Sequence, residues 1–286
     1  METYFSLYDE GRIKLFKLQG GEEDARQLLL YALDIDMNEL LLHYTDSSVD
    51  EEKAARYRAL IEKRAAGVPL QYLTHVQNFC GLDMYVDENV LIPRYDTEIL
   101  VETVLENEKH LSATADGSAC KLRVLDMCTG SGCIAIALAK LGGYEVYGAD
   151  ISRRALEIAD RNAAANGVDI TFYESCMFDQ LGELRDLDVI VSNPPYIKRA
   201  VIDSLMTEVR DHEPRTALDG GVDGLDFYRI IARDAHEHLK AGGRLYLEIG
   251  YDQAEEVSAL LTQERFSNIH VVKDLSGLDR VVYASI

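Results

Sequence analysis

The stretch VLDMCTGSGCIAIALA, residues 124–139, reads as a strand, a turn rich in small residues and a helix in immediate succession. In such a turn, backbone N–H groups at the start of the helix can approach a ligand closely. Gly130, Gly132 and Ala135 also satisfy the pattern G-x-G-x-x-A. Alone, this pattern is as consistent with a tight turn that permits close packing as with a binding site.

An acidic residue supports the binding interpretation. Asp150 follows the turn by about twenty residues and ends the next apolar segment, where a carboxylate can accept hydrogen bonds from ribose hydroxyls. Asp150 could instead cap the helix that begins near Ser152, although Ser152 can serve that role itself. Turn and acid together predict a nucleotide-type site, with NAD and S-adenosylmethionine both open as ligands.

The remainder of this half alternates between two patterns. Continuous Val/Ile/Leu segments that alternate with amphipathic ones predict an α/β fold with a mostly parallel sheet covered on both faces. The predicted strands are 122–128, 145–150, 170–175, 187–193, 243–250, 268–274 and 280–286, and the predicted helices are 132–141, 152–167, 225–240 and 253–263. Ligands of such sheets bind outside the carboxyl ends of the strands, at the switch point of the strand order.

The first third of the chain has a different character. Apolar residues at helical spacing run through 22–66, and Gly67 and Pro69 follow as stop signals. Short extended segments then predict a hairpin, and a helix follows over 96–107 with Asp96 or Thr97 as its N-cap. Residues 109–121 read as a polar surface loop. We therefore predict a helical domain over 1–73, a hairpin connector over 74–92 and a larger domain over 93–286.

Composition limits the compartment and the partners. The chain has 286 residues and a formal net charge of -21, which disfavours nucleic acid as the main partner because such binding rests on Lys and Arg contacts to phosphates. Its five cysteines include no C-x-x-C pair, so free thiols are expected rather than a metal site. No basic segment precedes an apolar one at the start, and no apolar run could span a bilayer, so we expect a cytoplasmic protein without a membrane anchor.

The stretch VSNPPYI, residues 191–197, places an asparagine and two prolines at the end of the fourth predicted strand. Two consecutive prolines fix the backbone and lack N–H donors, so the available polar groups are acceptors. The Asn193 side-chain oxygen and the Pro194 carbonyl could accept both N–H bonds of a planar NH2 group, and Tyr196 could pack on its face. This segment, residues 193–196, is called the clamp below.

With the clamp, the chain resembles the S-adenosylmethionine-dependent methyltransferases that carry (N/D)-P-P-(Y/F). A nicotinamide-dependent oxidoreductase has no use for such a clamp. A rigid turn that ends a strand is the structural alternative, which the clamp's occurrence with LDMCTGSG and Asp150 disfavours. Methyltransferases that act on adenine N6 or guanine N2 of nucleic acids share the clamp, and a cofactor-binding module without catalysis is a further alternative.

Further motifs narrow the resemblance. GVPLQYLTH, NVLIPRYDTEILVE, EVRDHEPRTALDGGVDGLDFYR and LYLEIGYDQ are similar to signatures of the protein-glutamine N5-methyltransferases that act on peptide-chain release factors, the PrmC/HemK family. The resemblance implies a Rossmann-like class I methyltransferase fold with a seven-stranded, mostly parallel sheet. It also implies a helical N-terminal domain that helps to dock class 1 release factors, whose Gly-Gly-Gln glutamine is the target, and S-adenosylhomocysteine as the other product.

The resemblance also implies the site residues. The methionine part of the cofactor would contact Cys128, Thr129, Gly130, Ser131 and Gly132, the ribose would contact Asp150, and the adenine would lie near Cys176 and Met177. The substrate amide would contact Asn193, Pro194, Pro195 and Tyr196; of these, Asn193, Pro194 and Tyr196 would be catalytic, and Asn193 would also contact the cofactor. Arg94, Thr97 and Glu98 would lie near the site, or would only form a helix start with surface ion pairs. Two positions depart from the family pattern, because Cys128 replaces a frequent glycine and Cys176 a frequent aspartate.

Overall fold

The computed structural model describes residues 2–46, 48–109 and 121–286. The predicted loop at 109–121 therefore falls almost wholly outside the described residues. The chain forms two compact units. Residues 1–76 and 206–212 make up the helical unit, and residues 77–205 and 213–286 make up the α/β unit. The hairpin that we expected to be a separate connector thus groups with the larger unit.

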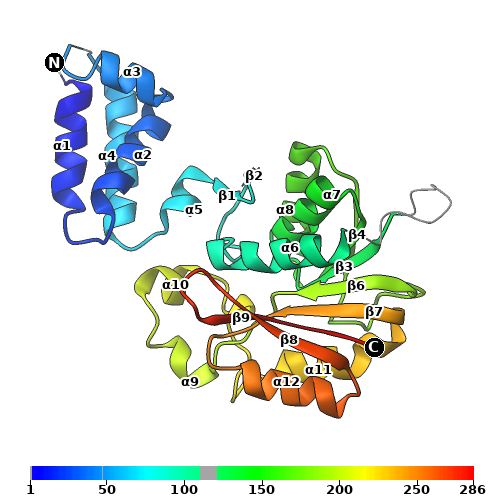
Figure 1. Ribbon diagram of the computed structural model, residues 1–286. Helices are drawn as coiled ribbons and strands as arrows, with labels where there is room; N and C mark the ends of the chain where they lie inside the picture. The colour runs from blue at the N-terminus through cyan, green and yellow to red at the C-terminus, as the bar shows by residue number, and fades with distance from the viewer. Residues whose placement is uncertain (1, 47, 110–120) are drawn as a thin grey trace. The chain divides into compact units, whose positions relative to one another are not determined.

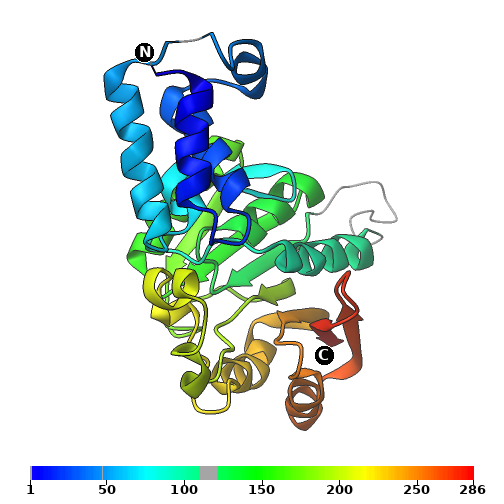
Figure 2. The same ribbon diagram turned by 90° about the vertical axis from the view of Figure 1, so that its left-hand side faces the viewer.

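The helical unit packs short amphipathic helices around leucines and a tyrosine. Its helices are α1 (Tyr4–Lys14), α2 (Gly21–Leu33), α3 (Met37–Leu42), α4 (Glu51–Ala65), α5 (Leu70–Thr74) and, from the later chain, α10 (Thr207–His212). Thr3, Asp36 and Asp50 cap α1, α3 and α4 with their side chains. α1, α2 and α4 lie side by side (Figure 1, Figure 2), with Leu28 and Tyr57 fully buried between them.

A buried arginine joins α10 to this unit. The Arg64 guanidinium donates to Asp24 Oδ2 at 2.7 Å and to Glu208 Oε1 at 2.6 Å. Because Arg64 is only 4% exposed, its positive charge is buried, and these two carboxylates stabilise it. The sequence patterns did not reveal that residues 206–212, which follow the clamp in the chain, belong to the helical unit.

The α/β unit is a seven-stranded sheet with helices on both faces. Its strands are β3 (Arg123–Met127), β4 (Glu145–Asp150), β5 (Ile170–Glu174), β6 (Leu187–Ser192), β7 (Leu239–Glu248), β8 (Ser267–Lys273) and β9 (Asp279–Ser285). They are ordered β5-β4-β3-β6-β7-β9-β8, and β9 runs antiparallel to its two neighbours. The predicted α/β class and mostly parallel sheet are confirmed, and the switch point lies between β3 and β6.

Two helical layers bury the two faces of the sheet (Figure 1). One layer contains α6 (Tyr95–Glu108), α7 (Cys133–Gly142) and α8 (Arg153–Asn166), and the other contains α11 (Asp226–Asp234) and α12 (Ala254–Gln263). A short hairpin of β1 (Gln77–Phe79) and β2 (Leu82–Met84) packs its Phe79 and Met84 into the first of these cores. α9 (Arg199–Ile202) lies in the segment after the clamp.

Two details of the prediction are wrong. α6 begins at Tyr95 with Arg94 as N-cap, and neither Asp96 nor Thr97 caps it, because both lie inside the first turn and their side chains contact other elements. The helix predicted over 225–240 ends at Asp234, followed by a single 3-10 turn, and β7 already begins at Leu239.

Candidate active site

The sheet register brings four candidate side chains to one level. Met127 pairs with Ala149 on β4 and with Ser192 on β6, and Ser192 pairs with Leu247 on β7. The next residue on each strand therefore emerges at the carboxyl edge, where ligands of parallel sheets bind. These next residues are Asp150, Cys128, Asn193 and Glu248, on four neighbouring strands.

A cavity of about 330 Å³ opens at this edge. Of the predicted site residues, its lining contains Cys128, Gly130, Asp150, Cys176, Met177, Asn193 and Pro195. Thr129, Ser131, Gly132, Pro194, Tyr196, Arg94, Thr97 and Glu98 are not part of the lining. A volume of this size suits a small organic ligand. The structure thus brings the glycine-rich turn, the acid after β4 and the clamp to one cavity.

A buried carboxylate holds the glycine-rich turn. Asp126 Oδ2 accepts hydrogen bonds from Thr129 Oγ1 at 2.6 Å and from the Ala135 N–H at 3.1 Å. Burial raises the pKa of Asp126 to about 7, against the effect of these two donors. The Thr129 side chain therefore points into the protein. Gly132 has φ +80°, and a Cβ there would lie 3.0 Å from the Ala159 Cβ, so a side chain would be both strained and crowded.

Cys128 adopts a conformation that favours glycine. Its φ is +62°, in the left-handed region, which costs a non-glycine residue about 1 kcal/mol or more. Its Sγ lies 4.0 Å from Met177 Sδ, and burial raises the pKa of the thiol. Cys128 is therefore a neutral, packed wall of the cavity. A glycine, which the resemblance implies as the frequent residue here, would avoid this strain.

Asp150 is held by the backbone and keeps accepting capacity. Its Oδ2 accepts from the Gly130 N–H at 2.9 Å and its Oδ1 from the Ser152 N–H at 2.8 Å. Burial is the main cause that raises its pKa, and the backbone donors oppose it. Each carboxylate oxygen can accept a second hydrogen bond, so Asp150 can also bind a pair of hydroxyl groups. Ser152 caps α8 through the Ala155 N–H, as predicted for one of the two alternatives.

Of the two acceptors predicted in the clamp, the Asn193 side-chain oxygen belongs to a residue that lines the cavity and the Pro194 carbonyl does not. Asn193 Nδ2 donates to Thr97 Oγ1 at 3.2 Å. Because the two ends of a planar amide point apart, its Oδ1 faces away from the buried Thr97, and Asn193 is one of the residues that line the cavity. Among the described residues, no group donates to the Pro194 carbonyl. Both prolines are buried, so the segment is stiff.

The back of the clamp is fixed by a glycine-rich segment and a glutamine. The Gly220 N–H donates to the Ile197 carbonyl at 2.9 Å, and Gln253 Nε2 donates to the Tyr196 carbonyl at 3.1 Å. A Cβ on Gly224 would lie 2.4 Å from that same carbonyl oxygen. Gly220 and Gly224 therefore pack on the clamp.

Tyr196 faces away from the cavity. Its hydroxyl donates to Glu248 Oε1 at 3.3 Å, and burial raises the pKa of Tyr196. Glu248 is 1% exposed, and its Oε2 has no hydrogen-bond partner in the part of the chain that the structure describes. This carboxylate was not among the predicted site residues. Only its position at the end of a buried strand could have indicated it.

Arg94 forms an ion pair with Glu213, the first residue after α10. Its Nη2 donates to both carboxylate oxygens of Glu213 at 2.6 Å, and Glu213 is 6% exposed. Pro214, Thr216 and Ala217, directly after Glu213, line the cavity. Arg94 therefore acts on the cavity through Glu213. Glu98 accepts from the Cys80 N–H at 2.8 Å and so stabilises the turn between β1 and β2 instead.

We expect Arg94→Met to weaken ligand binding in this cavity about tenfold, which corresponds to ~1.4 kcal/mol. The variant removes the guanidinium that neutralises the buried Glu213, and losing one partner of such a pair is unfavourable. The measurement is calorimetric titration with S-adenosylhomocysteine. Arg215→Met is the control, because its exposed pair with Asp203 at 3.6 Å contributes little. Equal affinity of Arg94→Met and wild type would contradict this role.

Comparison with known proteins identifies the family. Residues 97–216 match the model of the methyltransferase small domain, and residues 10–74 match that of the PrmC N-terminal domain. The release factor glutamine methyltransferase of Geobacter sulfurreducens is 45% identical over 267 residues, which cover 92% of this chain and 90% of that protein. This chain belongs to the release factor glutamine methyltransferase family. The resemblance that its motifs predicted is confirmed.

Other relatives agree with this family membership. The release factor glutamine methyltransferase of Thermodesulfovibrio yellowstonii is 39% identical over 262 residues, covering 91% of this chain and 90% of that protein. A methyltransferase structure from Pyrococcus furiosus shares the fold, with a TM-score of 0.53 and 16% sequence identity. The match covers 81% of this chain and 98% of the Pyrococcus furiosus chain. In the chain described here, residues 97–216, which match the model of the methyltransferase small domain, contain the glycine-rich turn, Asp150 and the clamp.

Several cavity residues were missed by the sequence reasoning. Val90 and Leu91 line the cavity from the loop after the hairpin, and Phe227 lines it from α11. The first two lie in the stretch NVLIPRYDTE, which signalled the family but not a pocket wall. Apolar residues in a loop before a proline are a weak signal, because such residues more often fill a core.

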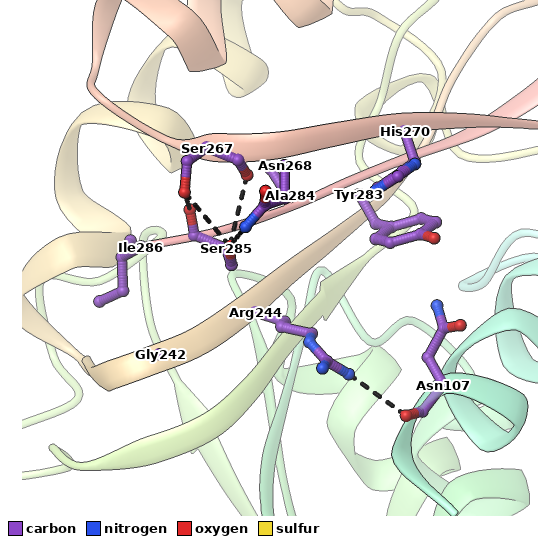
Figure 3. A pocket seen from close by; sticks show the side chains of 10 residues that line it. All are labelled: Asn107, Gly242, Arg244, Ser267, Asn268, His270, Tyr283, Ala284, Ser285 and Ile286. Carbon is purple, nitrogen blue, oxygen red and sulfur yellow. Dashed lines mark hydrogen bonds between the residues drawn. The ribbon is translucent and has the colours of Figure 1, made fainter.

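A second cavity, of about 540 Å³, lies near the amino end of β7 (Figure 3). Arg244 points there toward Asn107, donating to its carbonyl, and also pairs with Glu108 at 2.7 Å. Tyr283 and His270 stack with ring centroids 4.8 Å apart. None of the predicted site residues lines this cavity, and its cation is already paired. The cavity at the carboxyl ends is therefore the candidate active site.

Metal and membrane features are absent from the described ranges. No group of three or more His, Cys, Asp or Glu residues there is arranged to hold a metal ion. Cys80, Cys128, Cys133 and Cys176 are free, and the fifth cysteine, Cys120, lies outside these ranges. No helix within 2–46, 48–109 or 121–286 has the length and apolar character to cross a membrane.

Proposed function

We propose that this protein transfers a methyl group from S-adenosylmethionine to the side-chain nitrogen of the glutamine in the Gly-Gly-Gln motif of class 1 peptide-chain release factors. Family membership supports the reaction class. The observation that carries the proposal is the orientation of Asn193, which lines the cavity and whose NH2 donates to the Thr97 hydroxyl oxygen, so that the amide oxygen is not used in that contact. An acceptor is what a substrate amide NH2 requires.

The residues of the cavity fit S-adenosylmethionine. Asp150 has the free accepting capacity that ribose hydroxyls need, and Met177, Leu91 and Phe227 offer apolar surface to an adenine ring. Cys176 also lines the cavity, but its N–H is already bonded to Gln180 Oε1 at 2.7 Å, so adenine binding relies on packing more than on this group. When bound, the cofactor supplies an electrophilic methyl group on a sulfonium.

The clamp addresses the poor reactivity of an amide nitrogen. The nitrogen lone pair of an amide is delocalised into the carbonyl, so its alkylation requires alignment and loss of that resonance. Asn193 Oδ1 and the Pro194 carbonyl can accept the two N–H bonds, orient the nitrogen toward the cavity and stabilise positive charge that develops on it. The nitrogen becomes acidic only after alkylation, so no early general base is required. Pro195 and Gln253 keep the clamp backbone in place.

The helical unit supports a protein substrate. It exposes large apolar side chains, with Phe16 72%, Leu41 69% and Leu42 76% accessible, and we propose that this unit docks the release factor. A net charge of -21 favours such a partner over a phosphate backbone. A cytoplasmic location follows from this substrate, because release factors act on the ribosome.

The test is transfer of labelled methyl from S-adenosylmethionine to a purified release factor, followed by peptide mass spectrometry. We expect label on the Gly-Gly-Gln glutamine, and no label on a release factor in which this glutamine is replaced by alanine. A parallel reaction with DNA and RNA examines the nucleic-acid alternative. Label on nucleic acid and none on the release factor would overturn the proposal, and binding of cofactor without any transfer would favour a non-catalytic module.

A further inference from the structure

An asparagine on α8 joins two walls of the candidate active site. Asn162 Nδ2 donates to the Ser131 carbonyl at 2.9 Å and to the Tyr85 carbonyl at 3.0 Å, and Asn162 Oδ1 accepts from the Tyr85 N–H at 2.7 Å. The side chain is 1% exposed and does not itself line the cavity. Any effect of Asn162 on a ligand must therefore pass through the backbone at Ser131 and Tyr85.

Backbone chemistry determines the orientation of this amide. A carboxamide offers two N–H donors and one oxygen acceptor. The Tyr85 N–H can only donate and the two backbone carbonyls can only accept, so one orientation of the Asn162 amide satisfies all three groups. A buried backbone group that loses its partner destabilises the structure. Asn162 therefore fixes the position of Ser131 relative to Tyr85, which an apolar side chain of similar size could not do.

The first of the two walls is the glycine-rich turn. Gly130 and Gly132, on either side of Ser131, have φ of +56° and +80°. Glycine leaves the backbone free to adopt many other conformations, so contacts from outside the turn must hold this one. The Ala135 N–H, four residues after Ser131, donates to a side-chain carboxylate and not to the Ser131 carbonyl. The Ser131 carbonyl is held instead by the side chain of Asn162.

The second wall is the loop that follows β2. Val90 and Leu91 of this loop line the cavity. The loop turns tightly before them, because Asp87 Oδ1 accepts from the Asn89 N–H at 2.9 Å and from Asn89 Nδ2 at 2.8 Å. The contacts of the Tyr85 backbone attach the start of this turn to α8. The loop lies between the regions that match the two family models, so neither matched region contains this wall.

We propose that Asn162 is a positioning residue for the cofactor, which holds the glycine-rich turn and the loop after β2 at the separation that the ligand requires. This inference rests on the proposed function for the identity of the ligand. There, the turn contacts the methionine part of S-adenosylmethionine, and Leu91 offers apolar surface to the adenine ring. A shift between the two walls would therefore disturb both ends of one molecule.

The first test is calorimetric titration of Asn162→Asp and Asn162→Ala with S-adenosylhomocysteine, at a temperature where circular dichroism shows each variant to be folded. An ionised aspartate keeps an oxygen for the Tyr85 N–H but has no donor for either carbonyl. Both variants should bind the ligand about tenfold more weakly than wild type. At saturating cofactor, kcat and the KM for the release factor should stay within about threefold of wild type, because the clamp is unchanged.

A matched control lies one helical turn further along α8. Asn166 Nδ2 donates to the Asp83 carbonyl on β2 at 3.1 Å and to the Asn162 carbonyl at 3.0 Å, so both of its acceptors lie outside the glycine-rich turn. Asn166→Ala should keep the wild-type affinity for S-adenosylhomocysteine, whatever its effect on thermal stability. A loss of affinity in Asn166→Ala as large as in Asn162→Ala would assign the effect to general loosening of α8 and overturn the proposal.

Amide hydrogen exchange provides a second measurement, which requires no ligand. The Tyr85 N–H donates to Asn162 Oδ1, so it should exchange at least about tenfold faster in Asn162→Ala than in wild type. The amide of Val191, inside β6, should stay equally protected in both proteins. Unchanged exchange at Tyr85, or equal affinity of the Asn162 variants and wild type, would overturn the role of Asn162. If wild type binds S-adenosylhomocysteine and the Asn162 variants bind it weakly, but wild type methylates no release factor, the proposed function fails and this role stands.

Discussion

Asn193→Ala is expected to lower kcat for glutamine methylation by a factor on the order of 10² to 10³, the range seen when one preorganised polar contact to a reacting group is removed. The alanine variant leaves the substrate NH2 with the Pro194 carbonyl as its only acceptor from the clamp. Alignment of the nitrogen and stabilisation of its developing charge both suffer. Cofactor affinity should stay within about threefold, because Asp150 and the glycine-rich turn are unchanged.

The measurement combines steady-state kinetics on a release factor with calorimetric titration of S-adenosylhomocysteine. Asn166→Ala is a suitable control, because that amide also bonds two groups, the Asp83 and Asn162 carbonyls, but lies at the end of α8 away from the clamp. Activity of Asn193→Ala within a few-fold of wild type would remove the clamp from the reaction. A parallel loss of cofactor affinity would show instead that Asn193 is mainly a cofactor contact.

The sequence allowed us to predict those parts of the site that are formed by residues close together in the chain. Strand, turn and helix succeed one another around Gly130, and Asp150 and Asn193 each end a predicted strand. Because parallel strands end at one edge, the cavity could be anticipated from these positions. The register then placed Cys128, Asp150 and Asn193 at one level, as the topology requires.

Contacts across long sequence separations could not be predicted. Thr97 was interpreted as a possible helix cap, but its hydroxyl bonds to Asn193, 96 residues later in the chain. Glu248 is a single acid at the end of an apolar strand, and nothing local distinguishes it from a surface residue. Its carboxyl group accepts from the Tyr196 hydroxyl, a contact that depends on β6 and β7 lying side by side.

The helical unit was incompletely predicted for a related reason. Only Leu7 and Gly11 of α1 are buried, so apolar residues recur only weakly at helical spacing along this helix. α1 packs through its close approach to α4 rather than through a row of large apolar side chains. A Cβ on Gly11 would lie 1.9 Å from the Tyr57 hydroxyl oxygen, so the helix approaches α4 closely at that point. Such close approach depends on the tertiary partner, which a window of sequence does not contain.

Asp150→Ala is expected to produce the opposite pattern to Asn193→Ala. The variant removes the acceptor for the ribose hydroxyls, and hydrogen bonds to a charged group contribute about 1.5–3 kcal/mol each. It also frees the Gly130 and Ser152 N–H groups that the carboxylate holds. Cofactor affinity should therefore fall by a factor on the order of 10². At saturating cofactor, kcat should remain within a few-fold of wild type, because the clamp is intact.

The measurement is titration of both S-adenosylmethionine and S-adenosylhomocysteine, with kcat determined at several cofactor concentrations. Asp150→Asn helps to separate two causes, because it keeps one oxygen for the backbone donors but loses the charge. If Asp150→Asn binds as poorly as Asp150→Ala, the charge and the second acceptor oxygen matter more than the shape of the turn. If both variants bind the cofactor as wild type does, the ribose is not held by Asp150, and the cavity must bind its ligand in another orientation.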